Sequence, residues 1–291
     1  MTLQRRIKPD FIGIGFQRCG TSWLNKILFE HPEIGKPSSG LHFFTDNFSK
    51  GERWYEEKLA EYLQGKRIVG ECSTPYCYPN LAPIVAERIH SLYPDVKLIF
   101  SIRHPVKRCE SDYRRLGRIG NIQESNITFQ SAIQNYPEIL ERSLYSPVLS
   151  QFYSKFPKSN IHIIRFDDIE NNSHYVVKKL FRFLNVNQGF IPPSLNDQLG
   201  ATYNMHSMPL ERSIIKTQEM VQILLRHLPK NNSKSVRKVG RYFVKKLRNL
   251  NRSSSINDNV FVEKLGLEFK NDLIDTMNLT DLDLEEWINN E

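Results

Sequence analysis

The apolar positions of the chain fall into two kinds of pattern. Four short runs of apolar, β-branched or aromatic residues predict buried strands at Phe11–Gly15, Ile68–Cys72, Val96–Ile102 and Ile161–Phe166. Longer segments carry apolar residues three and four positions apart and predict helices at Thr21–Glu30, Leu81–Tyr93, Pro105–Arg118, Leu144–Phe156 and Ser173–Leu184. Strands that alternate with helices in this way build a parallel sheet covered on both faces. The pattern therefore predicts an α/β fold.

The strand and helix signals weaken after Gly189. The chain has 291 residues, 40% of them hydrophobic, which is enough to bury one sizeable core. We expect a single domain over residues 1–291, with the α/β core in residues 10–190. Residues 190–260 are interpreted as a mainly helical accessory region on the acceptor side, and residues 260–291 as a helical return onto the core.

A glycine-rich loop follows the first predicted strand and opens the first predicted helix. Residues 15–22 read Gly-Phe-Gln-Arg-Cys-Gly-Thr-Ser. In nucleoside triphosphatases such a loop reads G-x-x-x-x-G-K-[ST]; its backbone N–H groups hold phosphate, its Lys reaches the β- and γ-phosphates, and its hydroxyl holds Mg²⁺. Here Thr21 occupies the Lys position, and Arg18 supplies the positive charge from within the loop. The loop predicts phosphate binding of a different kind.

A second phosphate position is predicted at the end of the strand Val96–Ile102. In a triphosphatase one such strand ends in an Asp that supports Mg²⁺, whereas here Arg103-His104-Pro105 follows and Ser111 lies about two helical turns further on. An Arg at the carboxyl end of a parallel strand lies on the ligand-binding edge of the sheet and grips phosphate through two hydrogen bonds. Together the two segments indicate a nucleotide with two separate phosphates and no metal between them.

These segments resemble those of sulfotransferases that use 3′-phosphoadenosine 5′-phosphosulfate (PAPS). Residues 16–24 resemble the 5′-phosphosulfate loop and residues 101–113 the 3′-phosphate motif. Residues 41–44 (Leu-His-Phe-Phe) are similar to the segment that presents the catalytic base, and residues 70–76 to the active-site strand of the glycosaminoglycan (heparan sulfate) type branch. The resemblance covers roughly residues 10–190. It implies a P-loop-type parallel sheet flanked by helices, PAPS as co-substrate, no metal, and sulfuryl transfer to a hydroxyl or amine of an acceptor.

The resemblance also implies the residues that bind the donor. They are Arg18, Cys19, Gly20, Thr21, Ser22, Trp23, Arg103 and Ser111. Arg18 stands where the family usually has Lys, and we expect it to stabilise the charge on the oxygen that leaves the sulfur; the alternative is a purely ground-state phosphate ligand. For Arg103 the alternative to the 3′-phosphate is a surface ion pair, and for Thr21 and Ser22 it is a simple helix cap.

The catalytic base is less directly implied. Relatives of the glycosaminoglycan type usually carry their catalytic Glu where this chain has Gly40. His42 is then the leading candidate, because an imidazole with a pKa near 6.5 accepts a hydroxyl proton at neutral pH. Glu71, at the end of a predicted strand, is second and Asp46 third. In the alternative interpretation His42 orients its loop or packs against Phe43.

A further departure is Cys72, which stands where the family pattern usually has Lys. Its absence leaves Arg18 with more of the task of stabilising the transferring group. Two other function classes therefore stay open. One is a degenerate member that binds nucleotide or polyanion without turnover, and the other is a kinase-like P-loop enzyme, which would need Lys at position 21 and an Asp near Arg103.

The positive charge is concentrated in one segment. The formal net charge is +8, and residues 230–252 hold nine basic residues and no acidic one, which leaves 31 basic and 32 acidic residues elsewhere. Such a segment attracts an anionic polymer or an anionic membrane surface, and its apolar residues have helical spacing. The alternative is a solvated helix face. No nucleic-acid partner is expected, because no recognition signature accompanies the charge.

The acceptor is not identified by the sequence. The resemblance favours a saccharide or glycolipid. A hydrophobic small molecule is the alternative, since several aromatic residues are available to line an apolar pocket, namely Trp23, Phe43, Phe44, Trp54, Tyr76 and Tyr78.

Cysteine spacing and hydropathy indicate the compartment. The four cysteines have no spacing typical of a zinc site and predict free thiols. No run reaches about 18 apolar residues, and the apolar stretch Phe11–Phe16 is too short for a signal peptide. We expect a microbial, cytoplasmic protein or an excised catalytic domain.

Overall fold

The computed structural model describes residues 6–119, 127–197 and 259–289. The chain divides into two compact units. The larger comprises residues 1–108, 140–200 and 264–291, and the smaller comprises residues 109–139 and 201–263. Most of the accessory region predicted for residues 190–260, including the basic segment 230–252, lies outside the described residues. The extent of a single domain and the role of that region stay predictions.

A five-stranded parallel sheet forms the centre of the larger unit, with strand order β2-β3-β1-β4-β5. The strands are β1 (Phe11–Gly13), β2 (Ile34–Gly35), β3 (Ile68–Cys72), β4 (Lys97–Ile102) and β5 (Ile161–Arg165). All four strands predicted from the sequence are present, with ends displaced by two residues or fewer. β2 was not predicted because two residues give no periodic signal. The α/β prediction is confirmed.

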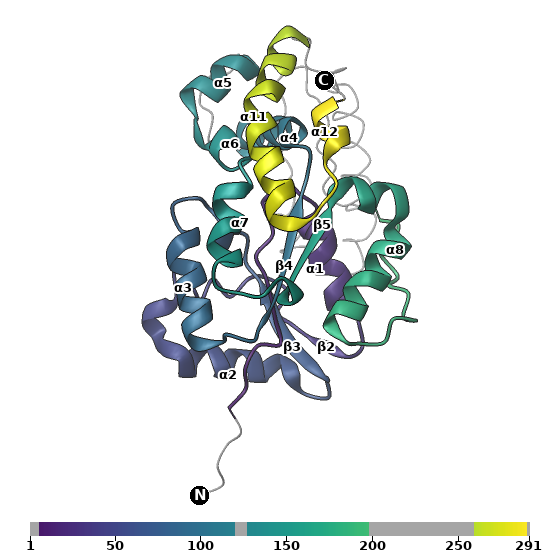
Figure 1. Ribbon diagram of the computed structural model, residues 1–291. Helices are drawn as coiled ribbons and strands as arrows, with labels where there is room; N and C mark the ends of the chain where they lie inside the picture. The colour runs from purple at the N-terminus through teal and green to yellow at the C-terminus, as the bar shows by residue number, and fades with distance from the viewer. Residues whose placement is uncertain (1–5, 120–126, 198–258, 290–291) are drawn as a thin grey trace, which may run out of the picture. The chain divides into compact units, whose positions relative to one another are not determined.

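Helices connect the strands (Figure 1). The larger unit holds α1 (Thr21–Glu30), α2 (Gly51–Leu63), α3 (Ala82–Leu92), α7 (Ser146–Tyr153), α8 (Phe166–Leu184) and α12 (Glu285–Asn289). The smaller unit holds α5 (Phe129–Asn135), while α4 (Pro105–Ile119), α6 (Glu138–Glu141) and α11 (Asn259–Thr280) include residues of both units. Short 3₁₀ turns lie at Phe48–Lys50, Thr74–Cys77 and Lys158–Asn160. None of the helices in the described ranges is long and apolar enough to cross a membrane.

Two differences from the predicted helices have local causes. α2 was not predicted because it buries only Tyr55 and Leu59, four residues apart, and the rest of the helix is largely polar. α8 begins at Phe166 instead of Ser173, with a non-helical residue at Asn172. The side chain of Asn172 accepts the N–H of Tyr175 at 3.1 Å and so starts the second part of the helix.

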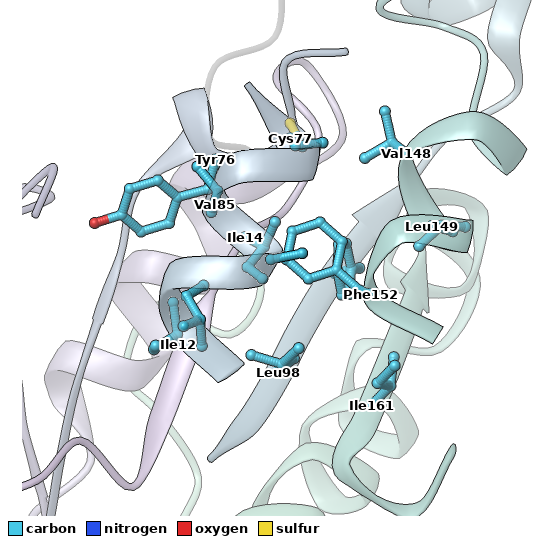
Figure 2. Packing of buried hydrophobic residues seen from close by; sticks show 14 of the residues in the cluster. Ile12, Ile14, Tyr76, Cys77, Val85, Leu98, Val148, Leu149, Phe152 and Ile161 are labelled. Carbon is cyan, nitrogen blue, oxygen red and sulfur yellow. The ribbon is translucent and has the colours of Figure 1, made fainter. Parts of the chain in front are cut away.

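Each strand buries both of its faces. On β1, Phe11 belongs to the apolar cluster that includes α1 and α8, whereas the next residue, Ile12, belongs to the cluster that includes α2, α3 and α7. Figure 2 shows the second cluster, where Ile12 and Leu98 of adjacent strands meet Val85 of α3 and Phe152 of α7. Burial on both faces explains why the strands are continuously apolar in sequence. It leaves the carboxyl ends of the strands as the place for polar chemistry.

Candidate active site

The loop between β1 and α1 turns at the carboxyl end of the sheet. Beyond β1 the chain stays beside β4, since the N–H of Ile14 donates to Ile99 O at 2.8 Å and that of Phe16 to Ser101 O at 3.2 Å. The loop then places Arg18 at φ 73° and Gly20 at φ 85°. A left-handed conformation suits Gly but is costly for Arg, and such strain is typical of functional loops.

The start of α1 is open to a ligand. Gly20 is its N-cap, and no side chain among the described residues caps the helix. The first N–H groups of a helix have no partner inside it, and the helix dipole makes this end attractive to anions. The loop also passes very close to β4, because a Cβ on Gly15 would lie 2.8 Å from Ser101 Oγ. The N-terminus of α1 and the backbone of the loop together form an anion-binding cradle.

Arg103 follows β4 directly and is held by aromatic residues. The Tyr145 hydroxyl accepts the Arg103 N–H at 3.2 Å and donates to the Arg103 carbonyl. The guanidinium lies 4.2 Å from the centre of the Phe166 ring, a cation–π contact. No described carboxylate pairs with Arg103, and its Nε is buried without a hydrogen-bond partner in the described part of the chain. The side chain is therefore oriented but keeps donors for a ligand.

Tyr145 connects the loop to Arg103. Its ring packs edge-on against Phe16 with centroids 4.7 Å apart, and its hydroxyl lies 3.9 Å from Cys19 Sγ. Burial raises the pKa of Tyr145 well above its usual value, so the hydroxyl stays protonated and can donate. The buried carboxylate of Asp272, on α11, accepts the N–H of Tyr145 at 2.8 Å. The sequence did not identify Tyr145 as a site residue, since its role depends on contacts with two distant segments.

Glu71, at the end of β3, is fully buried and bonded to three donors. It accepts the Tyr76 hydroxyl at 2.5 Å, the Ser73 hydroxyl at 2.6 Å and the Leu41 N–H at 2.8 Å. Burial raises the pKa of Glu71, and these hydrogen bonds act in the opposite direction. Glu71 thereby fastens the loop that carries His42 to the end of β3.

His42 lies in that loop with a partly exposed side chain. Its N–H donates to Ser73 Oγ at 3.1 Å, which couples its backbone to Glu71 through one shared hydroxyl. The backbone of His42 is left-handed, with φ 50°. Its ring Nδ1 has no hydrogen-bond partner among the described residues. Of the three candidate bases, His42 has an available ring nitrogen, Glu71 has engaged oxygens, and Asp46 is exposed on the surface.

Gly40 and Cys72 also meet at the end of β3. A Cβ on Gly40 would lie 2.3 Å from Ser73 Oγ and 2.7 Å from the Cys72 carbonyl, so this backbone leaves no room for a side chain at position 40. Burial raises the pKa of the Cys72 thiol to about 12. Neither residue supplies charge to the site.

The remaining candidate donor ligands lie in different settings. Thr21 is partly exposed at the start of α1 and Ser22 is exposed. Trp23 is buried in the apolar cluster with its Nε1–H donating to Leu195 O at 3.1 Å, so only its backbone is available to a ligand. Cys19 is fully buried, which raises its pKa to about 11.

Ser111 is buried on α4. It belongs to the smaller unit, so its placement relative to the larger unit is not described. In the described ranges no group of three or more His, Cys, Asp or Glu side chains is arranged to hold a metal ion.

Comparisons with known proteins agree with the resemblance. Residues 8–238 match the family model described as the sulfotransferase domain. Mouse heparan sulfate glucosamine 3-O-sulfotransferase 5 is 26% identical over 211 residues, which cover 68% of this chain and 56% of that protein. Human heparan sulfate glucosamine 3-O-sulfotransferase 6 is 36% identical over 109 residues, covering 38% of this chain and 31% of that protein.

Among solved structures, a sulfotransferase from Alicyclobacillus acidocaldarius has a similar fold. Its TM-score is 0.62 at 21% identity, and the match covers 96% of this chain and 98% of that one. The chain spans only about half the length of the first curated relatives it matches, 56% in the case of the mouse protein.

Proposed function

Because the chain belongs to the sulfotransferase domain family, we propose that it transfers the sulfuryl group of PAPS to a hydroxyl or amine of a saccharide acceptor. The observation that carries the proposal is the pair of cationic positions on adjacent strands. Arg18 lies in the loop after β1, and Arg103 follows β4, which pairs with β1. Tyr145 contacts both segments. This arrangement fits a nucleotide whose 5′-phosphosulfate and 3′-phosphate leave the same ribose.

Unpaired polar atoms at this edge of the sheet support a polar ligand. Gln17 Oε1, Ser101 Oγ, Arg103 Nε and His42 Nδ1 are all buried without a partner among the described residues. Such atoms are costly to leave unsatisfied in a native protein. We assign the loop N–H groups, Thr21 and Ser22 to the 5′-phosphosulfate. Arg103 takes the 3′-phosphate, and Ser111 is proposed as its second ligand.

In the proposed reaction the acceptor oxygen or nitrogen attacks the sulfur in line with the oxygen that leaves. The bond from sulfur to the bridging oxygen breaks, and its electron pair departs with 3′-phosphoadenosine 5′-phosphate (PAP). Arg18 stabilises the charge that develops on that oxygen. His42 takes the proton of the acceptor through its unpartnered nitrogen. Glu71 positions the His42 loop, since its oxygens already accept three hydrogen bonds.

The acceptor class rests on the relatives. The named heparan sulfate enzymes support a saccharide, and the basic segment 230–252 would suit one that is already anionic. A glycolipid at an anionic membrane surface would meet the same segment. Transfer of ³⁵S-labelled sulfate to N-sulfated heparosan fragments, compared with 4-nitrophenol, separates saccharide acceptors from small phenols.

Calorimetry in the absence of magnesium tests the donor assignment. The protein should bind PAP more tightly than ADP, which lacks the 3′-phosphate. Arg103→Ala should lower PAP affinity by about 10- to 100-fold, because a charge-assisted bond to phosphate contributes about 1.5–3 kcal/mol. The same variant should leave ADP affinity unchanged. Equal weakening of both ligands would contradict the assignment of Arg103, and magnesium-dependent preference for ATP would overturn the proposed function.

A second function, nucleotide binding without turnover, is favoured by one observation. Gly40, where relatives usually carry the catalytic Glu, has no space for a side chain. Tight binding of PAP together with no transfer to any acceptor, and no slow hydrolysis of PAPS, would establish that reading.

A further inference from the structure

Lys36 is a buried cation that the proposed reaction has not used. It follows β2 directly and so lies at the carboxyl edge of the sheet. Only 3% of its surface is exposed. Its Nζ donates to the Pro37 carbonyl at 2.6 Å, which is its one hydrogen bond among the described residues. An ammonium has three donors, so two of them are left without an acceptor.

Nothing nearby neutralises this charge directly. No described carboxylate forms an ion pair with Lys36, and the Phe29 ring centre lies 5.9 Å from its Nζ. Burial lowers the pKa of Lys36, whereas the neighbouring Cys72 and Glu71 raise it. A buried, incompletely bonded ammonium lowers the stability of a fold, and such groups are typical of sites that bind anions.

The side chain that borders Lys36 faces the phosphate loop. Cys72 pairs with Gly13 of β1, two residues before the loop begins at Gly15. A Cβ on Gly13 would lie 2.3 Å from Cys72 Sγ, so the Cys72 side chain leans towards β1. Lys36 interacts electrostatically with Cys72 and Glu71, and Glu71 fastens the His42 loop. Lys36 therefore borders both the donor loop and the proposed base.

We propose that Lys36 contacts the sulfuryl oxygens of the donor and holds the group in line between the phosphate loop and His42. The proposal rests on the proposed function. Lys36 makes no bond and transfers no proton in the reaction; its charge is complementary to oxygens that carry negative charge before and during transfer. The uncharged thiol at position 72 leaves space beside β1 that the ammonium of the neighbouring strand serves.

The test compares two ligands that differ only by the sulfuryl group. Calorimetry measures the affinity of wild type and Lys36→Met for PAPS and for PAP, without acceptor. We expect Lys36→Met to lower PAPS affinity by tenfold or more and to change PAP affinity by less than twofold. Its Tm should equal or exceed that of wild type, because an unsatisfied buried charge is removed. Lys66→Met is the matched control, since Lys66 also donates to a carbonyl, that of Pro32 at 3.0 Å, but is exposed.

A double variant separates contact from folding. Lys36→Met with Cys72→Lys returns an ammonium to the same place from β3 and should recover most of the PAPS affinity. A lower Tm with an unchanged ratio of PAPS to PAP affinity would make Lys36 structural and overturn the proposal. Equal loss of both ligands, or no recovery in the double variant, would also overturn it. Failure of the wild type to bind PAP would instead refute the proposed function itself.

Discussion

Tyr145→Phe is the most direct test of how the donor site is built. The change removes one oxygen and keeps the ring, which packs against Phe16 with centroids 4.7 Å apart. It deletes the hydroxyl that binds both the N–H and the carbonyl of Arg103. The aromatic contact therefore stays, and only the link between the two phosphate segments is lost.

The magnitude follows from the groups left behind. A buried polar group without a partner costs about 1–3 kcal/mol. The variant leaves two such groups on Arg103, but the half-buried residue lets water reach part of that backbone. We therefore expect a loss of about 2–3 kcal/mol in the free energy of unfolding. The guanidinium loses the anchor of its backbone, so PAP affinity should fall about tenfold while ADP affinity changes little.

Urea unfolding and calorimetry measure the two effects. The matched control is Tyr55→Phe, since Tyr55 is equally buried and its hydroxyl has no partner in the described part of the chain. That control should be neutral or stabilising and should not change PAP affinity. Stability within about 0.5 kcal/mol of wild type for Tyr145→Phe, or equal loss of PAP and ADP binding, would refute the proposed link between Tyr145 and Arg103.

Three further outcomes are expected. His42→Gln should lower kcat by about 100-fold or more with unchanged PAP affinity; steady-state kinetics that show normal kcat would remove His42 as the base. Gly40→Glu should not restore a catalytic carboxylate but should destabilise the protein by more than about 3 kcal/mol in urea unfolding, because its Cβ would lie 2.3 Å from Ser73 Oγ; a stable, more active variant would disprove this. Burial lowers the pKa of His104 and His162 to about 4; the unfolded imidazoles bind protons near pH 6.5, so stability should be complete above pH 6.5 and fall by up to about 3 kcal/mol per residue towards pH 4. Urea midpoints that stay constant between pH 7.5 and 4.5 would contradict that expectation.

The sheet could be predicted from the sequence because burial on both faces makes its strands continuously apolar. Phe11 and Ile12 pack into different clusters, and the same holds for Leu98 and Ile99. Elements with weaker signals were not predicted. β2 has two residues, and α2 carries a narrow buried stripe of two side chains.

The site could be predicted in part, for a related reason. Arg18 and Arg103 stand in local motifs, where spacing along the chain reveals a role. Tyr145 and Lys36 do not, since Tyr145 lies 42 residues from Arg103 and 126 from Cys19. Position 40 was interpreted as a missing catalytic group. Only the contact with Ser73 reveals the close backbone approach that Gly allows there.

Asp272 bears on the order in which the molecule is completed during synthesis. It accepts the N–H of Tyr145 from 127 residues further along the chain. Domains tend to fold from the N-terminus as the chain is made, yet here the early loop and strand ends must wait for a residue close to the C-terminus. A nascent chain that stops before Asp272 can pair its strands, but the backbone of Tyr145 and Ser146 lacks its acceptor. Nucleotide binding should therefore be one of the last properties that the growing protein acquires.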